Sequence, residues 1–282
     1  MKKQQLILVS ASLVLFIVLF FFGRTIPEKK VSDKNPSSPE TASASALTTD
    51  QLIAQARQKL NNEQIMRLNQ LEKGIIRGDV KQQQIDAYKQ LATFWGDSAH
   101  EHLLGAFYIG EGAKLENSEK NLNFAARLLL EDMMMETNPP LQKWMGVQAK
   151  ALLEKSLEIN PANDSAKVGI GACYLFGNIS EAPMQGIQMV REVLAKDPHN
   201  AYAHMVLGMG GIKSGQFDKA IEHFEAVVKD NPANMEAVFN LAESYDRKGD
   251  KANAIKWYTV VRDKIAVPEA KKEIDERIKA LQ

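Results

Sequence analysis

Three short stretches of the sequence, NPAN at 160–163, DPHN at 197–200 and NPAN at 231–234, share a proline in the second position and an asparagine in the fourth. They lie 37 and then 34 residues apart. Proline cannot continue a helix, because it lacks the backbone N–H and its ring clashes with the preceding turn. Asparagine is favoured at helix N-termini. Each stretch therefore predicts the end of one helix and the start of the next.

The remainder of the chain from residue 50 has helical patterning, and no long alternating run typical of a strand occurs there. Asp50 is the expected N-cap of the first helix. We therefore predict an all-α chain. The predicted helices span 50–60, 62–76, 79–95, 98–114, 118–136, 140–159, 164–177, 184–196, 201–214, 217–230, 235–248, 251–264 and 269–281.

A helix–turn–helix unit repeated every 34 residues is typical of the tetratricopeptide repeat. Small and large residues recur at matching places in three consecutive units. The matching residues are Leu207, Gly208, Ala220, Phe224 and Pro232 in 201–234; Leu241, Ala242, Tyr245, Ala254 and Tyr258 in 235–268; and Ile170, Gly171, Tyr174, Gly186, Val190 and Pro198 in 164–200.

On these residues the chain resembles the tetratricopeptide-repeat family. It departs from the family where Lys167, His204 and Val238 replace a tryptophan, and where Gly211 replaces a tyrosine. The resemblance implies a solenoid of antiparallel helix pairs, in which the small residues let paired helices approach closely. We expect a degenerate repeat and further helices in 50–161, three repeats at 164–200, 201–234 and 235–268, and a capping helix at 269–282.

The N-terminus contains an uncharged apolar run, Leu6–Phe22, after Lys2 and Lys3. At about 1.5 Å per residue it can span a bilayer core of about 30 Å. It is longer than the apolar part of a cleaved signal peptide and has no small-residue cleavage site. We expect residues 1–24 to be a transmembrane signal-anchor helix and residues 25–49, rich in Ser, Pro and Ala, to be a disordered linker.

With this anchor we expect a single-pass protein of a bacterial inner membrane, with its repeat domain in the periplasm. The two lysines before the apolar run favour this orientation, whereas Arg24, Lys29, Lys30 and Lys34 after it favour the opposite one.

The composition excludes several classes of function. Lysine plus arginine and aspartate plus glutamate both number 35, so the net charge is zero and a nucleic-acid partner is not expected. The single cysteine, Cys173, is expected to be a small buried apolar residue. His100 and His102 face different sides of a helix. We identify no catalytic residue, no metal site and no cofactor, and we do not expect an enzyme.

The resemblance places a ligand groove on the first helices of the repeats. The groove positions here are apolar in the middle and acidic at one edge, and the methionines among them can adapt to varied partners. An alternative is that Met205, Met209 and Phe239 pack against one another as core. The candidate groove residues are Val168, Ala172, Tyr202, Met205, Met209, Ile212, Phe239 and Glu243.

The expected function is a membrane-tethered scaffold that binds a helical or apolar protein segment in this groove. The residues do not match the carboxylate clamp of chaperone adaptors. The alternative is a periplasmic assembly chaperone or adaptor that holds a client helix or an unfolded segment, similar in layout to the cytochrome c maturation or translocon-associated proteins.

Overall fold

The computed structural model describes residues 47–77, 80–179 and 183–282. The expected anchor at Leu6–Phe22 lies outside the described residues, as does the expected linker except for residues 47–49. Within the described ranges no helix has both the length and the apolar character needed to cross a membrane.

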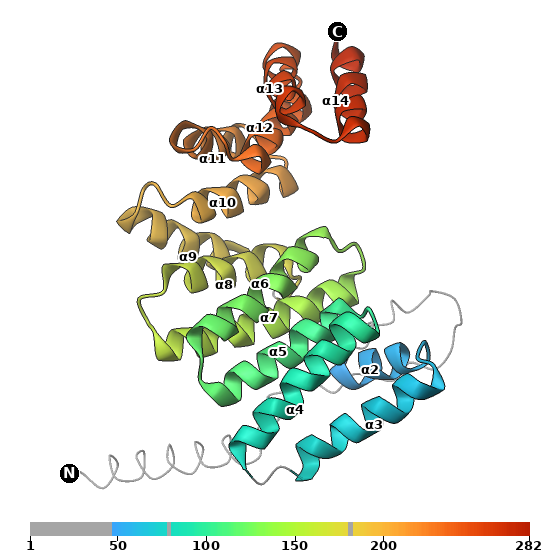
Figure 1. The fold of residues 1–282 in the computed structure, drawn as a ribbon. Coiled ribbons are helices and arrows are strands. Elements are labelled where there is room, and N and C mark those ends of the chain that lie inside the picture. Colours follow the sequence, from blue (N-terminus) through green and yellow to red (C-terminus); the bar gives the residue numbers. More distant parts are fainter. Residues whose placement is uncertain (1–46, 78–79, 180–182) are drawn as a thin grey trace, which may run out of the picture. The chain divides into compact units, whose positions relative to one another are not determined.

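Helices joined by short turns make up the described part of the chain, which contains no strand (Figure 1). In chain order they are α2 (Thr49–Arg57), α3 (Asn62–Arg77), α4 (Lys81–Thr93), the π-helical turn η1 (Phe94–Ser98), α5 (His102–Glu116), α6 (Glu119–Met135), α7 (Pro139–Ile159), α8 (Asp164–Phe176), α9 (Pro183–Lys196), α10 (Ala201–Lys213), α11 (Phe217–Asp230), α12 (Met235–Lys248), α13 (Lys251–Lys264) and α14 (Pro268–Leu281).

The asparagines of the three quoted stretches cap the helices that follow them, as predicted. Asn163 Oδ1 accepts from the backbone N–H of Ala166 at 2.9 Å. Asn200 and Asn234 do the same at the starts of α10 and α12, both at 3.0 Å. These bonds satisfy one of the four backbone donors that the first turn of a helix leaves open.

The first helix is capped differently from the prediction. Its N-cap is Thr48, whose hydroxyl accepts from the backbone N–H of Gln51 while the Gln51 side chain accepts from the backbone N–H of Thr48. This reciprocal pair is a capping box. Asp50 instead lies in the first turn, where its charge favours the positive end of the helix dipole.

Consecutive helices pair as antiparallel hairpins: α4 with α5, α6 with α7, α8 with α9, α10 with α11, and α12 with α13. The first helices of successive hairpins also touch, α6 beside α8 and α8 beside α10. In this pairing α5 is the second helix of its hairpin, and it touches α7, the second helix of the next one.

The junction between α4 and α5 also differs from the prediction of a helix that begins at residue 98. The chain instead passes through the wider turn η1, and His100 takes the left-handed φ of 56° before α5 begins. Gly96 lies against Gly105, because a Cβ on Gly105 would be 3.2 Å from the Gly96 backbone. Phe94 and Trp95 of η1 are fully buried, so burial of these rings anchors the turn.

Three clusters of buried apolar residues hold the helices together. One lies among α2–α5, one among α5–α10 and one among α10–α14. Helix α10 belongs to two of them, with Val206 and Leu207 in the middle cluster and Met205 in the C-terminal one. Ile274 and Ile278 of α14 cover the end of the C-terminal cluster.

The small residues of the repeats allow the close helix contacts that the sequence predicts. A Cβ on Gly171 of α8 would be 2.5 Å from Val190 Cγ2 and 2.9 Å from the Gly186 carbonyl oxygen of α9. A Cβ on Gly208 of α10 would be 2.6 Å from the ring of Phe224. A larger side chain would require a shift of the α9 backbone at Gly171 and of the Phe224 ring at Gly208.

Candidate functional site

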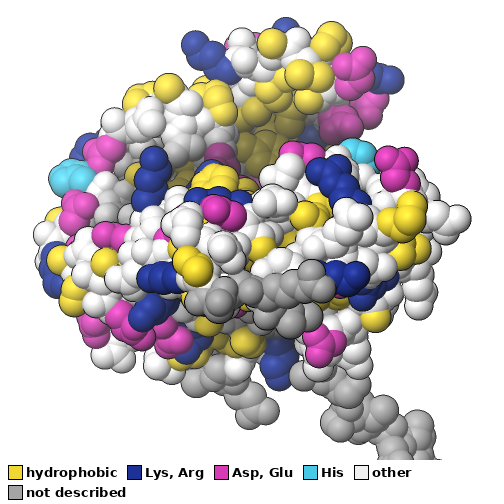
Figure 2. Space-filling model, turned by 60° about the horizontal axis from the view of Figure 1, so that its bottom comes forward, with side chains coloured by type: hydrophobic (Ala, Val, Ile, Leu, Met, Phe, Trp, Pro, Cys, Tyr) yellow, Lys and Arg dark blue, Asp and Glu magenta, His cyan; other side chains and the backbone are white. Residues whose placement is uncertain are grey.

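The first helices of the hairpins border a hollow of about 590 Å³, which we call the methionine hollow. Its residues come from α6, α7, α8, α10 and α12 and from the turn before α8. Figure 2 shows one face of the molecule with a recess that contains hydrophobic side chains. The residues that line the methionine hollow are Asn123, Arg127, Leu130, Glu131, Met134, Leu153, Asn163, Ser165, Gly169, Tyr202, Met205, Met209 and Glu236.

Three of the candidate groove residues, Tyr202, Met205 and Met209, line this hollow. Tyr202 is 39% exposed and Met209 is half-buried, whereas Met205 is 7% exposed and belongs to the C-terminal core cluster. Met209 therefore presents surface to the hollow, whereas Met205 is mainly a core residue, so each of the two alternatives applies to one of the methionines.

Two candidates, Val168 and Ala172, are fully buried in the middle core cluster and present no surface to a ligand. They correct the expectation for α8, whose contribution to the hollow is Ser165 and Gly169 instead. A Cβ on Gly169 would meet Leu153 at 2.8 Å, so α7 approaches closely here and its Leu153 takes part in the lining.

The other three candidates lie outside the methionine hollow. Ile212 and Phe239 are half-buried and pack on the C-terminal core cluster. The Phe239 ring lies edge-on to Tyr258, with centroids 6.1 Å apart. Glu243 accepts from Arg247 on the next turn of its own helix at 2.6 Å. This salt bridge occupies the carboxylate that was expected at the acidic edge of the groove.

Several polar side chains of the methionine hollow have no hydrogen-bond partner within the described chain. The side chains of Asn123, Ser165, Tyr202 and Glu236 make no hydrogen bond to another described residue, and Asn123 Oδ1 is also shut off from solvent. A buried acceptor without a donor costs about 1–3 kcal/mol. Burial of the Tyr202 hydroxyl raises the pKa of that phenol, and the charge of Glu131 adds to the effect.

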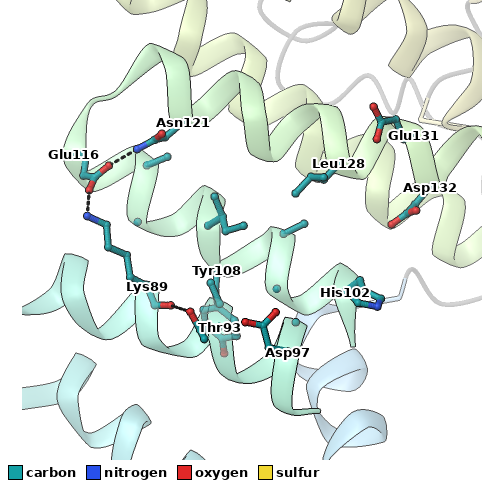
Figure 3. A pocket seen from close by; sticks show the side chains of 17 residues that line it. Lys89, Thr93, Asp97, His102, Tyr108, Glu116, Asn121, Leu128, Glu131 and Asp132 are labelled. Atoms are coloured by element: carbon teal, nitrogen blue, oxygen red, sulfur yellow. Dashed lines mark hydrogen bonds and ion pairs between the residues drawn. The ribbon is translucent and has the colours of Figure 1, made fainter. Parts of the chain in front are cut away.

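A second hollow of about 570 Å³, here called the acidic hollow, lies between α4, η1, α5 and α6 (Figure 3). Its floor is made of small and apolar residues of α5 and α6, and charged side chains surround it. The residues that line it are Lys89, Ala92, Thr93, Gly96, Asp97, His102, Gly105, Ala106, Tyr108, Ile109, Gly112, Ala113, Glu116, Asn121, Leu128, Glu131 and Asp132.

One end of the acidic hollow is closed by a small polar network. Lys89 Nζ lies 2.5 Å from Glu116 Oε1, and Asn121 donates to the other oxygen of Glu116 at 2.7 Å (Figure 3). The bonds from Lys89 and Asn121 lower the pKa of the Glu116 carboxyl. The cation and this carboxylate therefore neutralise each other.

The other end of the acidic hollow contains Asp97, His102 and Asp132, which Figure 3 shows away from the Lys89 network. Asp97 and Asp132 make neither a hydrogen bond nor an ion pair with another described residue. Partial burial and the neighbouring Glu131 raise the pKa of the Asp132 carboxyl, while His102 acts in the opposite sense. Apart from His102, no cationic side chain of the lining lies at this end to offset the negative charge of the two carboxylates.

No residue of 118–136 is among the candidate groove residues predicted from the sequence, although this helix lines both hollows. Asn123, Arg127, Leu130 and Met134 follow one another at helical spacing on one face of α6. The alternation of first and second helices along the chain could have identified this helix from the sequence. Counting helices back in pairs from Asn163 makes 118–136 a first helix, on the same side as 164–177.

The remaining histidines form contacts that the sequence did not predict. His204 Nε2 donates to the carbonyl of Pro198 at 3.0 Å, so its Nδ1 accepts from His223 Nδ1 at 3.0 Å. Burial and the neighbouring His204 lower the pKa of His223. His223 is half-buried. His199 lies on the surface and pairs with Asp230 at 2.7 Å.

Cys173 is fully buried, as predicted, and burial raises the pKa of its thiol to about 12. Of the methionines at 133–135, Met133 is buried, Met134 lines the methionine hollow and Met135 is 84% exposed. Among the described residues no group of three or more His, Cys, Asp or Glu side chains is placed to hold a metal ion.

Residues 212–268, from the end of α10 to the start of α14, match the family described as Tetratricopeptide repeat. This segment of the chain carries tetratricopeptide repeats. Stacked helical repeats of this class present extended surfaces that bind proteins or peptides, and such proteins act in general as scaffolds and not as enzymes.

Among curated proteins, this chain is similar to the cellulose synthase operon protein C of Escherichia coli strain K12 and to the putative cellulose synthase operon protein C of Escherichia coli O157:H7. Each is 30% identical over 101 residues, which are 36% of this chain and 8% of the relative. The chain thus matches less than a tenth of the length of these relatives.

Solved structures with a similar course of the chain include YrrB, a TPR protein with an unusual peptide-binding site, at a TM-score of 0.41 and 16% identity over 73% of this chain and 97% of that one. MamA has a TM-score of 0.41 and 19% identity over 72% and 96%. MamA 41-end from Desulfovibrio magneticus RS-1 has a TM-score of 0.43 and 20% identity over 64% and 93%.

Proposed function

We propose that this tetratricopeptide-repeat chain is a membrane-tethered scaffold that binds an apolar, helical segment of another protein in the methionine hollow. The observation that carries the proposal is the combination of an apolar floor with polar groups that have no partner of their own. Met134, Met205 and Met209 supply adaptable apolar surface, while Asn123 and Tyr202 supply free hydrogen-bonding groups.

The position of the methionine hollow across successive hairpins fits a peptide segment. It is bordered by helices of four successive hairpins, so a ligand that fills it contacts α6, α8, α10 and α12. A helix laid along a groove makes contacts of this kind through side chains spaced three or four residues apart. Burial of its apolar side chains would supply about 25 cal/mol for each Å² removed from water.

The direct test is photocrosslinking in cells. A benzophenone amino acid at position 202 should capture one protein through an apolar segment, identified by mass spectrometry of the crosslinked peptide. The matched control is the same amino acid at position 66, because Met66 on α3 is 62% exposed and lines neither hollow. Equal capture of the same peptide at both positions would refute the groove.

A second test places negative charges in the methionine hollow. Tyr202→Glu combined with Met134→Glu should abolish the crosslink from a probe placed at position 209, while Met66→Glu should leave it unchanged. Tyr202 and Met134 retain exposed surface, so both substitutions are compatible with the fold. Far-UV circular dichroism checks that each variant keeps its helices.

The membrane tether in this proposal is the apolar run Leu6–Phe22, and the proposed location is a bacterial inner membrane with the repeats in the periplasm. Alkaline phosphatase fused after Gln282 should be active in intact cells, since it folds only outside the cytoplasm. If this fusion is inactive and a reporter that works only in the cytoplasm is active at the same position, the repeats lie in the cytoplasm and the proposed orientation is wrong.

A periplasmic assembly chaperone or adaptor is the second candidate, and the methionine content of the hollow is what favours it. Flexible thioether side chains repack around different apolar segments. The crosslink at position 202 separates the two functions. A scaffold yields one or a few folded partners in constant amount, whereas a chaperone yields many nascent clients that disappear when protein synthesis is stopped.

A further inference from the structure

The methionine hollow and the acidic hollow lie next to each other. Glu131 of α6 belongs to the lining of both. A ligand segment that extends beyond the methionine hollow past Glu131 therefore reaches the acidic hollow between α4, α5 and α6.

The charges that line the two hollows do not cancel. Their lysine and arginine residues are Lys89 and Arg127, and each already pairs with a lining carboxylate. Lys89 binds Glu116 at 2.5 Å and Arg127 binds Glu131 at 2.8 Å. The three carboxylates that remain unpaired within the described chain all carry the same sign. They are Asp97, Asp132 and Glu236.

The acidic hollow also has an apolar floor. Ala106 and Ala113 of α5 are buried there, and Ile109 and Leu128 are half-buried beside them. A hollow with an apolar floor and negatively charged edges is complementary to a side chain with a long aliphatic stem and a cationic end group. Lysine and arginine are the two side chains with that construction.

We propose that the acidic hollow receives a lysine or arginine side chain of the same partner segment whose apolar side chains occupy the methionine hollow. This inference rests on the proposed function, because it takes a protein segment to be the ligand. The partner segment is then a basic amphipathic helix, whose cationic residue meets Asp97 and Asp132. A purely apolar segment would cover these carboxylates without pairing them, which disfavours it.

The proposal can be tested with random peptides displayed on phage and selected on the full-length protein in detergent micelles. The selected peptides should combine apolar residues at helical spacing with an excess of lysine and arginine. A parallel selection on the Tyr202→Glu, Met134→Glu variant shows which peptides depend on the methionine hollow.

The decisive measurement is the affinity of one selected peptide and of its copy with the basic residue changed to glutamine. Asp97→Asn with Asp132→Asn should weaken the basic peptide about 5- to 10-fold and leave the glutamine copy unchanged, since each exposed pair contributes modestly. Added salt should weaken the basic peptide with the native protein and have little effect with the variant.

A matched control removes the same net charge elsewhere. Asp50→Asn with Glu63→Gln changes exposed carboxylates of α2 and α3 that line neither hollow, and it should leave both affinities unchanged. An equal loss with this control would make the effect one of net charge and overturn the proposal.

The two possible failures differ in outcome. Peptides that bind through the methionine hollow, show no basic excess and ignore the Asp97→Asn, Asp132→Asn variant would overturn this inference and leave the proposed function in place. No enrichment over the Tyr202→Glu, Met134→Glu variant would overturn both.

Discussion

The hairpins α8–α13 and the hairpins α4–α7 have the same helix pairing but are built from different local chemistry. In α8–α13 each first helix begins after an asparagine cap, and each hairpin closes on a small residue at a repeated position. In α4–α7 the first helices begin after Val80 and Ser118, and a π-helical turn separates α4 from α5. The comparison teaches that the repeat motif is one of several ways to make this hairpin, and that helix pairing extends beyond the motif.

The largest expected effect concerns the closeness of the helices. Gly171→Ala in α8 should lower the free energy of unfolding by about 3 kcal/mol, because the new methyl group would overlap Val190 and the Gly186 carbonyl. Gly112→Ala in α5 should be neutral or stabilise by up to about 1 kcal/mol, since its Cβ would meet only Tyr88 at 3.4 Å. Urea unfolding measures both. Equal losses would show that α4–α7 is packed as tightly as α8–α13.

The next effect tests the boundary between the two regions. Asn163 caps α8 and also donates to Glu119 of α6 at 2.7 Å, whereas Asn234 caps α12 without such a second bond in the described chain. Asn163→Ala should therefore cost about 2 kcal/mol and Asn234→Ala about 1 kcal/mol. If Asn234→Ala is as costly in thermal melts, the bond to Glu119 contributes nothing.

A pH effect on stability is expected from the histidine pair of α10–α11. The pKa of His223 is lowered from 6.5, so the unfolded chain binds a proton there more readily than the folded chain. Stability from this group is therefore complete above pH 6.5 and is lost as the pH falls through the lowered pKa of the folded state.

The size of the pH effect is limited to about 1 kcal/mol, the contribution of one hydrogen bond. His223→Gln can still donate to His204 and should reduce the difference in melting temperature between about pH 5 and about pH 7.5. If the difference in melting temperature between the two pH values is unchanged in this variant, the histidine pair is not the cause of the pH effect. His100 and His102 are exposed, so their replacement by glutamine serves as the control.

The smallest effect on stability concerns the methionine hollow, where the two regions meet. Asn123→Leu removes an amide whose Oδ1 has no donor in the described structure, so stability should be unchanged or rise by up to about 1 kcal/mol. Partner binding should nevertheless weaken. A clear loss of stability would mean that Asn123 has a structural bond and is not reserved for a ligand.

Much of the fold followed from the sequence, because its signals are local. Prolines such as Pro161 stop helices and asparagines such as Asn163 start them, so helix positions in 164–264 agree with the structure to within about two residues. The predicted helix start at residue 98 was wrong because η1 is stabilised by burial of Phe94 and Trp95. This burial depends on the neighbouring helices and cannot be read from a local sequence pattern.

The candidate site was only partly predictable, because a groove depends on which helices lie side by side. Tyr202 and Met209 were found from their places in a repeat, but the family positions also selected Val168 and Ala172, which are core in this chain. Asn123 was missed because its helix has no repeat motif. Exposure at a given position is set by neighbouring hairpins, and the sequence of one hairpin does not contain that information.

Helix α10 has a consequence for cooperativity. It contributes Val206 and Leu207 to the middle core cluster and Met205 to the C-terminal one, so the two clusters share one rigid element. In a linear array of hairpins, the coupling between neighbours decides whether the array melts in one transition or in several. Because the shared helix also supplies Tyr202, Met205 and Met209 to the methionine hollow, a ligand bound there would tie the melting of α11–α14 to that of α6–α9.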